Sequence, residues 1–334
     1  MKKVAVIGFG FMRKTHALNI LKNKNLQLVA IVDKNFKTSG EDIFSETGNF
    51  STGNINPEKI KKVHQYTSLD ECFQSEQLDA VHICVHTDLH YEFARKALSR
   101  GLHVLIEKPF CLDVHQGEEL ISMAKEKGVI LMVAHVVRFM PPYQKLKEWV
   151  DNGKYGKLKF LSLSRFSGVP LWGQWKDKQT AFGTSGGALF DLVVHDIDYA
   201  VNILGEPQKM TSFYLPGKLS PHDYINSIWD YADRELKVKI EGGNIFHSHF
   251  PFQTGFMASF EKASVCYSTL TPAHIFVSDD LHTEELAAGN LDEGYYNEID
   301  YFSICMEENY QPVKCTPQSS LTTIKICYEH FKKA

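Results

Sequence analysis

One helix-length segment, 185–205, carries a stripe of acids and a histidine in the sequence SGGALFDLVVHDIDYAVNILG. Asp191, His195, Asp198 and Asn202 follow at i, i+4, i+7 and i+11, one face of an otherwise apolar helix. Burying a carboxylate beside a histidine is costly unless the two share a polar pocket. We therefore predict that His195 is an acid/base and that Asp191 orients it. The alternative is a core histidine with satisfied hydrogen bonds, or a helix cap open to solvent.

A second set of charged residues ends the apolar run HVLIEKPF at 103–110. Glu107 and Lys108 close a predicted strand, and Pro109 restricts Lys108 to an extended backbone. Ligands of doubly wound sheets bind at the carboxyl ends of the strands. A lysine held there beside a nicotinamide can donate to a substrate hydroxyl and favour its ionised form. The alternative is an exposed Glu-Lys pair at a strand end.

The N-terminal stretch VAVIGFGFMRKTH (4–16) predicts a dinucleotide-binding turn. Gly8 permits a tight turn, and Gly10 lets the backbone approach a pyrophosphate at a helix N-terminus. Asp33 ends the next predicted strand, where a carboxylate accepts hydrogen bonds from ribose hydroxyls and repels a 2′-phosphate. These features favour NAD, and Lys34 beside Asp33 keeps NADP as the alternative cofactor. A glycine-rich turn of an unrelated α/β domain is the other interpretation.

Arg13 stands where the fingerprint normally has its third glycine, which allows close packing of helix on strand. We predict that the turn stays intact. We also predict either a slight outward shift of the helix or a guanidinium that points out of the helix–sheet interface, toward solvent or the cofactor.

The elements that must position these residues follow from the apolar pattern. Apolar runs alternate with segments of helical period over the first 137 residues, which predicts a parallel, doubly wound sheet. The predicted strands are 3–8, 26–33, 79–85, 103–108 and 129–134, and the predicted helices are 12–23, 88–100 and 113–127. The polar stretch 37–62 is predicted to be a surface insertion. Farther on, 235–242 and 254–270 alternate as half-buried strands do.

Composition limits the classes of function. The chain has 334 residues, 43% of them hydrophobic, which is enough for two cores. Its formal charge of −4 and scattered basic residues argue against nucleic acid or an anionic membrane as partner. Seven cysteines without a C-x-x-C motif fit a reducing cytosol, and the longest apolar run, 129–134, is too short to span a bilayer. With no secretory pattern at the N-terminus, we expect a soluble, cytoplasmic protein with a small-molecule partner.

The ordered set of motifs resembles the Gfo/Idh/MocA oxidoreductases, the family of glucose-fructose oxidoreductase and inositol dehydrogenase. The motifs are GFGFMRKTH, Asp33, HTDLH (86–90), EKP (107–109), AHVVRF (134–139), GGALFDLVVHDID (186–198) and NEIDYF (297–302). The resemblance implies a Rossmann dinucleotide-binding domain, 1–137, and a substrate-binding α/β domain with a large, mostly antiparallel sheet, 138–334. It also implies a homodimer or homotetramer through that sheet. Val85 and His86 depart from the T-P that the family often has there.

Residue by residue, Lys108 matches the lysine of the EKP motif, His195 the proposed base and Asp191 its acidic partner. The predicted cofactor-binding residues are Gly8, Gly10, Phe11, Met12, Asp33, Thr87, His90, Glu107 and Lys108. The predicted substrate-binding residues are Lys108, Arg138, Trp172, Asp191 and His195. Trp172 belongs to an aromatic segment that either walls a sugar site or packs in the core. No metal is required.

We thus predict an NAD(P)-dependent dehydrogenase acting on a secondary alcohol of a sugar, inositol or related polyol. His195 removes the hydroxyl proton, Lys108 orients the oxygen, and hydride passes to nicotinamide C4. Two alternatives remain. One is a nucleotide-binding sensor or regulator without chemistry, and the other is an NAD-using enzyme of the same fold that cleaves glycosides and accumulates no NADH.

Overall fold

The computed structural model describes residues 1–8, 10–34, 62–169 and 187–332. They form two compact units. Unit 1 comprises Met1–His135 and Tyr295–Leu321, and unit 2 comprises Val136–Gly294 and Thr322–Ala334. Trp172 and almost all of the predicted insertion lie outside the described residues.

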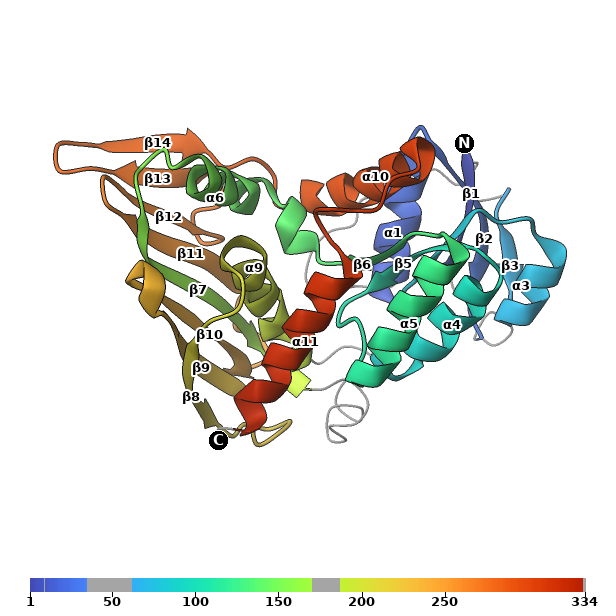
Figure 1. Cartoon of the computed structure of the whole chain (residues 1–334), viewed down its shortest axis with the longest axis horizontal. Coiled ribbons are helices and arrows are strands. Elements are labelled where there is room, and N and C mark those ends of the chain that lie inside the picture. Colours follow the sequence, from blue (N-terminus) through green and yellow to red (C-terminus); the bar gives the residue numbers. More distant parts are fainter. Residues whose placement is uncertain (9, 35–61, 170–186, 333–334) are drawn as a thin grey trace. The chain divides into compact units, whose positions relative to one another are not determined.

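Unit 1 is built on a parallel sheet in the order β3-β2-β1-β4-β5-β6 (Figure 1). Its central strands are almost fully buried, as their continuous apolar runs predict. Its elements are β1 (Lys2–Ile7), α1 (Phe11–Lys22), β2 (Leu26–Val32), β3 (His64–Tyr66), α3 (Leu69–Ser75), β4 (Ala80–Ile83), α4 (His90–Ser99), β5 (His103–Glu107), α5 (Val114–Lys127) and β6 (Leu131–Ala134). The order reverses between β1 and β4, which is where such sheets bind nucleotides.

The predicted strands and helices of the N-terminal region are all confirmed, with ends that differ by a few residues. The caps explain why α5 begins and ends where it does. Asp113 accepts a hydrogen bond from the amide of His115 at 2.7 Å, and Gly128 takes a left-handed conformation after the last turn. The short β3 and α3 were not predicted, because a strand of 3 residues and a helix of 7 hardly register as periodic patterns.

Unit 2 contains a mostly antiparallel sheet in the order β14-β13-β12-β11-β7-β10-β9-β8, in which only the β7–β10 pair runs parallel among the described strands. The strands are β7 (Leu158–Gly168), β8 (Lys209–Leu215), β9 (Tyr224–Tyr231), β10 (Leu236–Phe246), β11 (Gln253–Phe260), β12 (Ser264–Ser268), β13 (His274–Ser278) and β14 (Thr283–Ala287). The helices α6 (Pro141–Asn152) and α9 (Val194–Leu204) belong to the same unit, and α9 packs on β7 and β10 (Figure 1). The predicted antiparallel sheet is confirmed.

The chain returns to unit 1 near its C-terminal end. The returning segment, Tyr295–Leu321, comprises most of α10 (Glu293–Glu308) and the first turn of α11 (Pro317–Lys332). Asn23 donates to Asp300 at 2.7 Å, and the ring of Phe302 contacts the ring of His82 edge-on. The prediction of two consecutive domains, 1–137 and 138–334, did not include this return. No helix within the described ranges is long and apolar enough to cross a membrane.

Candidate active site and nucleotide-binding turn

The two glycines of the predicted nucleotide turn take conformations that favour glycine. A Cβ on Gly8 would lie 2.3 Å from the carbonyl oxygen of Cys84, and its φ of +131° also excludes most side chains. Gly10, with φ +136°, precedes the first turn of α1, and no described side chain caps that helix. The N–H groups at the start of α1 therefore suit an anionic ligand, so the turn fits the pyrophosphate of a dinucleotide.

Arg13 does not point toward solvent. Its guanidinium is buried, forms an ion pair with the carboxylate of Asp33, and donates to the carbonyl oxygen of Gly8 at 3.4 Å. The prediction that it points toward solvent is wrong, because a buried acid at the end of β2 offers the cation a partner. Its other predicted position, near the cofactor, stays a prediction. Arg13 thus joins the glycine turn to Asp33.

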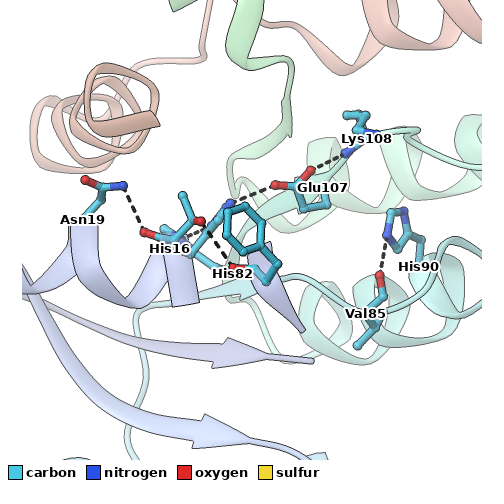
Figure 2. Close-up of polar contacts among 9 residues, drawn as sticks. His16, Asn19, His82, Val85, His90, Glu107 and Lys108 are labelled. Atoms are coloured by element: carbon cyan, nitrogen blue, oxygen red, sulfur yellow. Dashed lines mark hydrogen bonds and ion pairs between the residues drawn. The ribbon is translucent and has the colours of Figure 1, made fainter. Parts of the chain in front are cut away.

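A chain of buried polar side chains runs from α1 to the end of β5 (Figure 2). His16 Nε2 lies 3.0 Å from Glu107 Oε1, and His16 Nδ1 lies 3.0 Å from His82 Nδ1. The other oxygen of Glu107 accepts a hydrogen bond from the amide of Lys108 at 3.1 Å. Neither His16 nor His82 was predicted as a site residue, although a histidine inside the apolar run DAVHICV signals a buried polar contact.

The charges along this chain follow from its surroundings. Burial favours a higher pKa for Glu107, but the hydrogen bond and charge of His16, with Lys108 and His90, hold that pKa below its ordinary value. Burial and the neighbouring His16 lower the pKa of His82 well below its ordinary value. A neutral His82 protonated at Nδ1 can donate to His16, while its Nε2 has no partner among the described residues. Glu107 is thus an ionised carboxylate fixed beside Lys108.

His90 links two loops at the same edge of the sheet. Its ring nitrogens lie 2.9 Å from the carbonyl oxygen of Pro109 and 3.2 Å from that of Val85. Burial lowers the pKa of His90, against the opposing effect of these carbonyls. The ring therefore holds the loops that follow β4 and β5, whereas its predicted contact with a cofactor stays a prediction.

The predicted cofactor residues of unit 1 come to one edge of the sheet. They follow the carboxyl ends of the adjacent parallel strands β1, β2, β4 and β5. Phe11 and Met12 form the first turn of α1, Thr87 begins a 3₁₀ turn after β4, and Lys108 lies half-buried after β5. Their assignment to the cofactor remains a prediction.

The helix of the acid–histidine stripe differs from the expected regular form. Leu189–Val193 form a π-helical turn, in which the amide of Val194 reaches the carbonyl of Leu189, and regular α9 follows. Asp191 lies in this wide turn, so the predicted α-helical spacing to His195 does not hold there. Both side chains are nevertheless half-buried within a mostly buried helix, and π turns occur often at functional sites.

Other members of the stripe have structural partners. Asp198 accepts from Arg138 Nε at 2.7 Å and Nη2 at 2.5 Å, and from the hydroxyl of Thr323 at 3.1 Å. Asp196, which is not part of the stripe, forms a second buried pair with Arg165. Asp198 thus has buried structural partners, and the predicted pairing of Asp191 with His195 stays a prediction. A contact of Arg138 with substrate stays a prediction, and the geometry gives its guanidinium a buried structural role.

Lys108 belongs to unit 1, and Asp191 and His195 belong to unit 2, so their convergence on one substrate remains a prediction. In the described part of the chain, no group of three or more His, Cys, Asp and Glu side chains is arranged to hold a metal ion.

A Rossmann unit with this glycine turn defines a protein that binds a nicotinamide dinucleotide. The chain belongs to the Gfo/Idh/MocA family. The family model described as an oxidoreductase family with an NAD-binding Rossmann fold matches residues 2–135, and the model of the Gfo/Idh/MocA C-terminal domain matches residues 143–272. The resemblance noted in the sequence is confirmed.

Relatives of known name are sugar and inositol dehydrogenases. D-glucoside 3-dehydrogenase of Escherichia coli is 27% identical over 295 residues, covering 83% of this chain and 79% of that protein. The scyllo-inositol 2-dehydrogenase (NADP(+)) IolU of Bacillus subtilis is 26% identical over 100% of this chain and 97% of its own length. Four other curated relatives match over 40% to 53% of their length. The solved structure of levoglucosan dehydrogenase with NADH and levoglucosan has a TM-score of 0.81 at 17% identity, covering 100% of this chain and 97% of that one, which shows a shared fold.

Proposed function

We propose that this protein oxidises a secondary alcohol of a sugar, inositol or related cyclic polyol with NAD(P)⁺, or catalyses the reverse reduction. The observation that carries the proposal is Lys108 at the carboxyl end of β5, with its amide held by a Glu107 that His16 fixes in turn. Such a lysine is positioned by the fold at the edge where the nucleotide turn lies.

The proposed mechanism assigns one task to each side chain. Lys108 donates a hydrogen bond to the reacting hydroxyl oxygen, which stabilises negative charge on it. His195 removes the hydroxyl proton, and the carboxylate of Asp191 stabilises the resulting imidazolium. Nicotinamide, when bound, supplies the hydride acceptor at C4. The products are a ketone and the reduced nicotinamide, with the proton held on His195.

The substrate class rests on the relatives. The two curated relatives described above are named for a glucoside and for scyllo-inositol, which are both cyclic polyols with secondary hydroxyls. We propose a substrate from this chemical class. Polar side chains such as Asp191 and His195 would form hydrogen bonds with the free hydroxyls of such a ring.

The test is turnover of a panel of inositols and glucosides, followed by the absorbance of reduced nicotinamide. We expect Lys108→Ala and His195→Ala each to lower kcat by about 100-fold or more, the usual contribution of a positioned acid or base. The matched controls are Lys125→Ala in unit 1 and His282→Ala in unit 2. They change an exposed lysine and an exposed histidine. Unchanged turnover in both site variants would show that other residues do the chemistry.

The same panel separates the two other classes of function. A sensor binds nucleotide and turns over no polyol, whereas a glycoside-cleaving enzyme releases sugar without accumulating NADH.

We also propose that the protein forms a homodimer or homotetramer through one face of the sheet of unit 2. Exposed apolar side chains of four strands lie on that face: Phe160, Phe213, Ile228 and Met257. Clusters of this kind mark protein interfaces more often than free surface.

A further inference from the structure

The Arg13–Asp33 pair occupies the position that decides between the two nicotinamide dinucleotides. Asp33 follows β2, where the carboxylate of a Rossmann unit accepts hydrogen bonds from the adenosine ribose. Arg13 comes from the first turn of α1, and the two side chains are 3% and 5% exposed. Their mutual charge therefore acts with little screening by solvent.

We propose that Arg13 is a specificity-determining residue that makes the adenosine-ribose site accept the 2′-phosphate of NADP(H) as well as the free hydroxyl of NAD(H). The inference rests on the proposed function, because it concerns the same nucleotide site. Beyond the proposed function, it names Arg13 as the residue that determines whether NADP(H) binds as well as NAD(H).

The charge balance supports this role. An unpaired Asp33 would repel a 2′-phosphate, which carries roughly −1.5 to −2 charges near neutral pH. The ion pair with Arg13 removes the net negative charge from this end of β2. It also brings a guanidinium, whose donors match phosphate oxygens in a bidentate geometry.

The position of Arg13 ties this charge to the nucleotide turn. Arg13 Nη1 also donates to the carbonyl of Gly8, so the guanidinium lies between the glycine turn and the end of β2. A glycine at position 13 would leave that space without a cation, and Asp33 would then keep its full charge. Arg13, which replaces the third glycine of the fingerprint, is thus also the residue that lets the site accept a 2′-phosphate.

Binding to the purified full-length protein tests the proposal without relying on turnover. Titration calorimetry with NAD⁺, NADP⁺, 5′-AMP and adenosine 2′,5′-bisphosphate measures the effect of the 2′-phosphate in whole and fragment ligands. We expect the wild-type dissociation constants for NAD⁺ and NADP⁺ to agree within about tenfold. Arg13→Met should weaken NADP⁺ binding by at least about tenfold relative to NAD⁺, and Asp33→Asn should shift the ratio toward NADP⁺.

Matched variants keep the comparison interpretable. Lys22→Met removes one cation from the far end of the same helix and should leave the ratio unchanged. Arg13→Met leaves the buried carboxylate of Asp33 without its partner, which can prevent folding. A second comparison therefore uses two variants that lack this carboxylate. Asp33→Asn and the double variant Arg13→Met/Asp33→Asn both lack that carboxylate, and only the first should retain strong binding of adenosine 2′,5′-bisphosphate.

The outcomes separate the two proposals. A ratio of NADP⁺ to NAD⁺ affinity that is the same in all these variants overturns the role of Arg13. Wild-type protein that binds NAD⁺ and excludes NADP⁺ overturns it as well, while the proposed dehydrogenase function stands. Wild-type protein that binds neither nucleotide overturns both.

Discussion

His82 is an ionisable ring in a strand whose other residues are apolar. It contacts His16 through a hydrogen bond and Phe302 through an edge-on ring contact, and Glu107 lies beyond His16. Burial and the neighbouring His16 keep its pKa well below 6.5 in the folded protein. The fold therefore contains a histidine that is kept neutral at a pH where an exposed one gains a proton.

The sign of the resulting pH dependence is fixed. As the pH falls, the unfolded chain protonates His82 at its ordinary pKa of 6.5, and the folded chain does not. The stability that depends on a neutral His82 is fully present above that pH. It is lost as the pH falls from 6.5 toward the lower pKa of His82 in the folded protein. Between about pH 7.5 and about pH 5.5, protonation of His82 in the unfolded chain should lower the free energy of unfolding by up to about 1.4 kcal/mol.

Urea unfolding at the two pH values measures this loss. His82→Leu should show a smaller drop in unfolding free energy than wild type. Part of the drop should remain in this variant, because the pKa of His90 is also lowered. Glu107 does not contribute in this range, because its lowered pKa acts below 4.5. The exposed His282→Ala variant is the control. An equal drop in wild type and His82→Leu would mean that His82 is protonated in the folded protein.

Among the elements, α1 has a buried polar side. Arg13, His16 and Asn19 recur at three-residue spacing and are all buried, and they hold Asp33, Glu107 and a backbone carbonyl of the same helix. A helix with such a side is stable because each polar group has a specific partner. This is why α1 ties together the ends of β2 and β5, where the predicted site residues Asp33 and Lys108 lie.

Helix α5 packs closely on the C-terminal segment that returns to unit 1, and a substitution at Gly117 tests this contact. A Cβ on Gly117 would lie 2.7 Å from Leu321 Cδ1 and 2.8 Å from Cys111 Sγ. Gly117→Ala should destabilise the protein by about 1–2 kcal/mol, because overpacking outweighs the better helix propensity of alanine. Denaturant unfolding checks this, with the exposed Lys125→Ala of α5 as control.

Leu321 supplies the cross-check. The cost of Gly117→Ala should shrink in a Leu321→Ala background, since the leucine methyl group is what the new Cβ meets. A Gly117→Ala protein as stable as wild type would show that this segment does not pack on α5.

The sequence was informative where a pattern repeats over many residues. The strands and helices of the parallel sheet follow from apolar periodicity, and Lys108 follows from its place at a strand end. The π turn could not be predicted, because one extra residue in a turn leaves the apolar pattern nearly unchanged. The partners of Arg13, Asp198 and Arg138 could not be predicted either, since opposite charges far apart in sequence have many pairings until the fold selects one.

At the scale of the whole molecule, the proposed assembly concerns one face of the unit 2 sheet, which exposes apolar side chains. Strand register places Ile228 beside Lys239, Lys239 beside Ser162, and Ser162 beside Met257, so these residues form one row on one face. Phe160 and Phe213 lie two residues from this row on their strands and share the face. Met257 is 59% exposed and Phe213 is 55% exposed.

Two substitutions on this row test whether it joins copies of the chain. Ile228→Lys combined with Met257→Lys places charges in the centre of the face, where a buried unpaired charge is costly. Light scattering of the wild type should give the mass of a dimer or tetramer, and the double variant should lose at least half of that mass. Leu281→Lys is the matched control, because Leu281 is 90% exposed on the loop between β13 and β14, away from the row. A monomeric wild type, or a double variant of unchanged mass, would contradict assembly through this face.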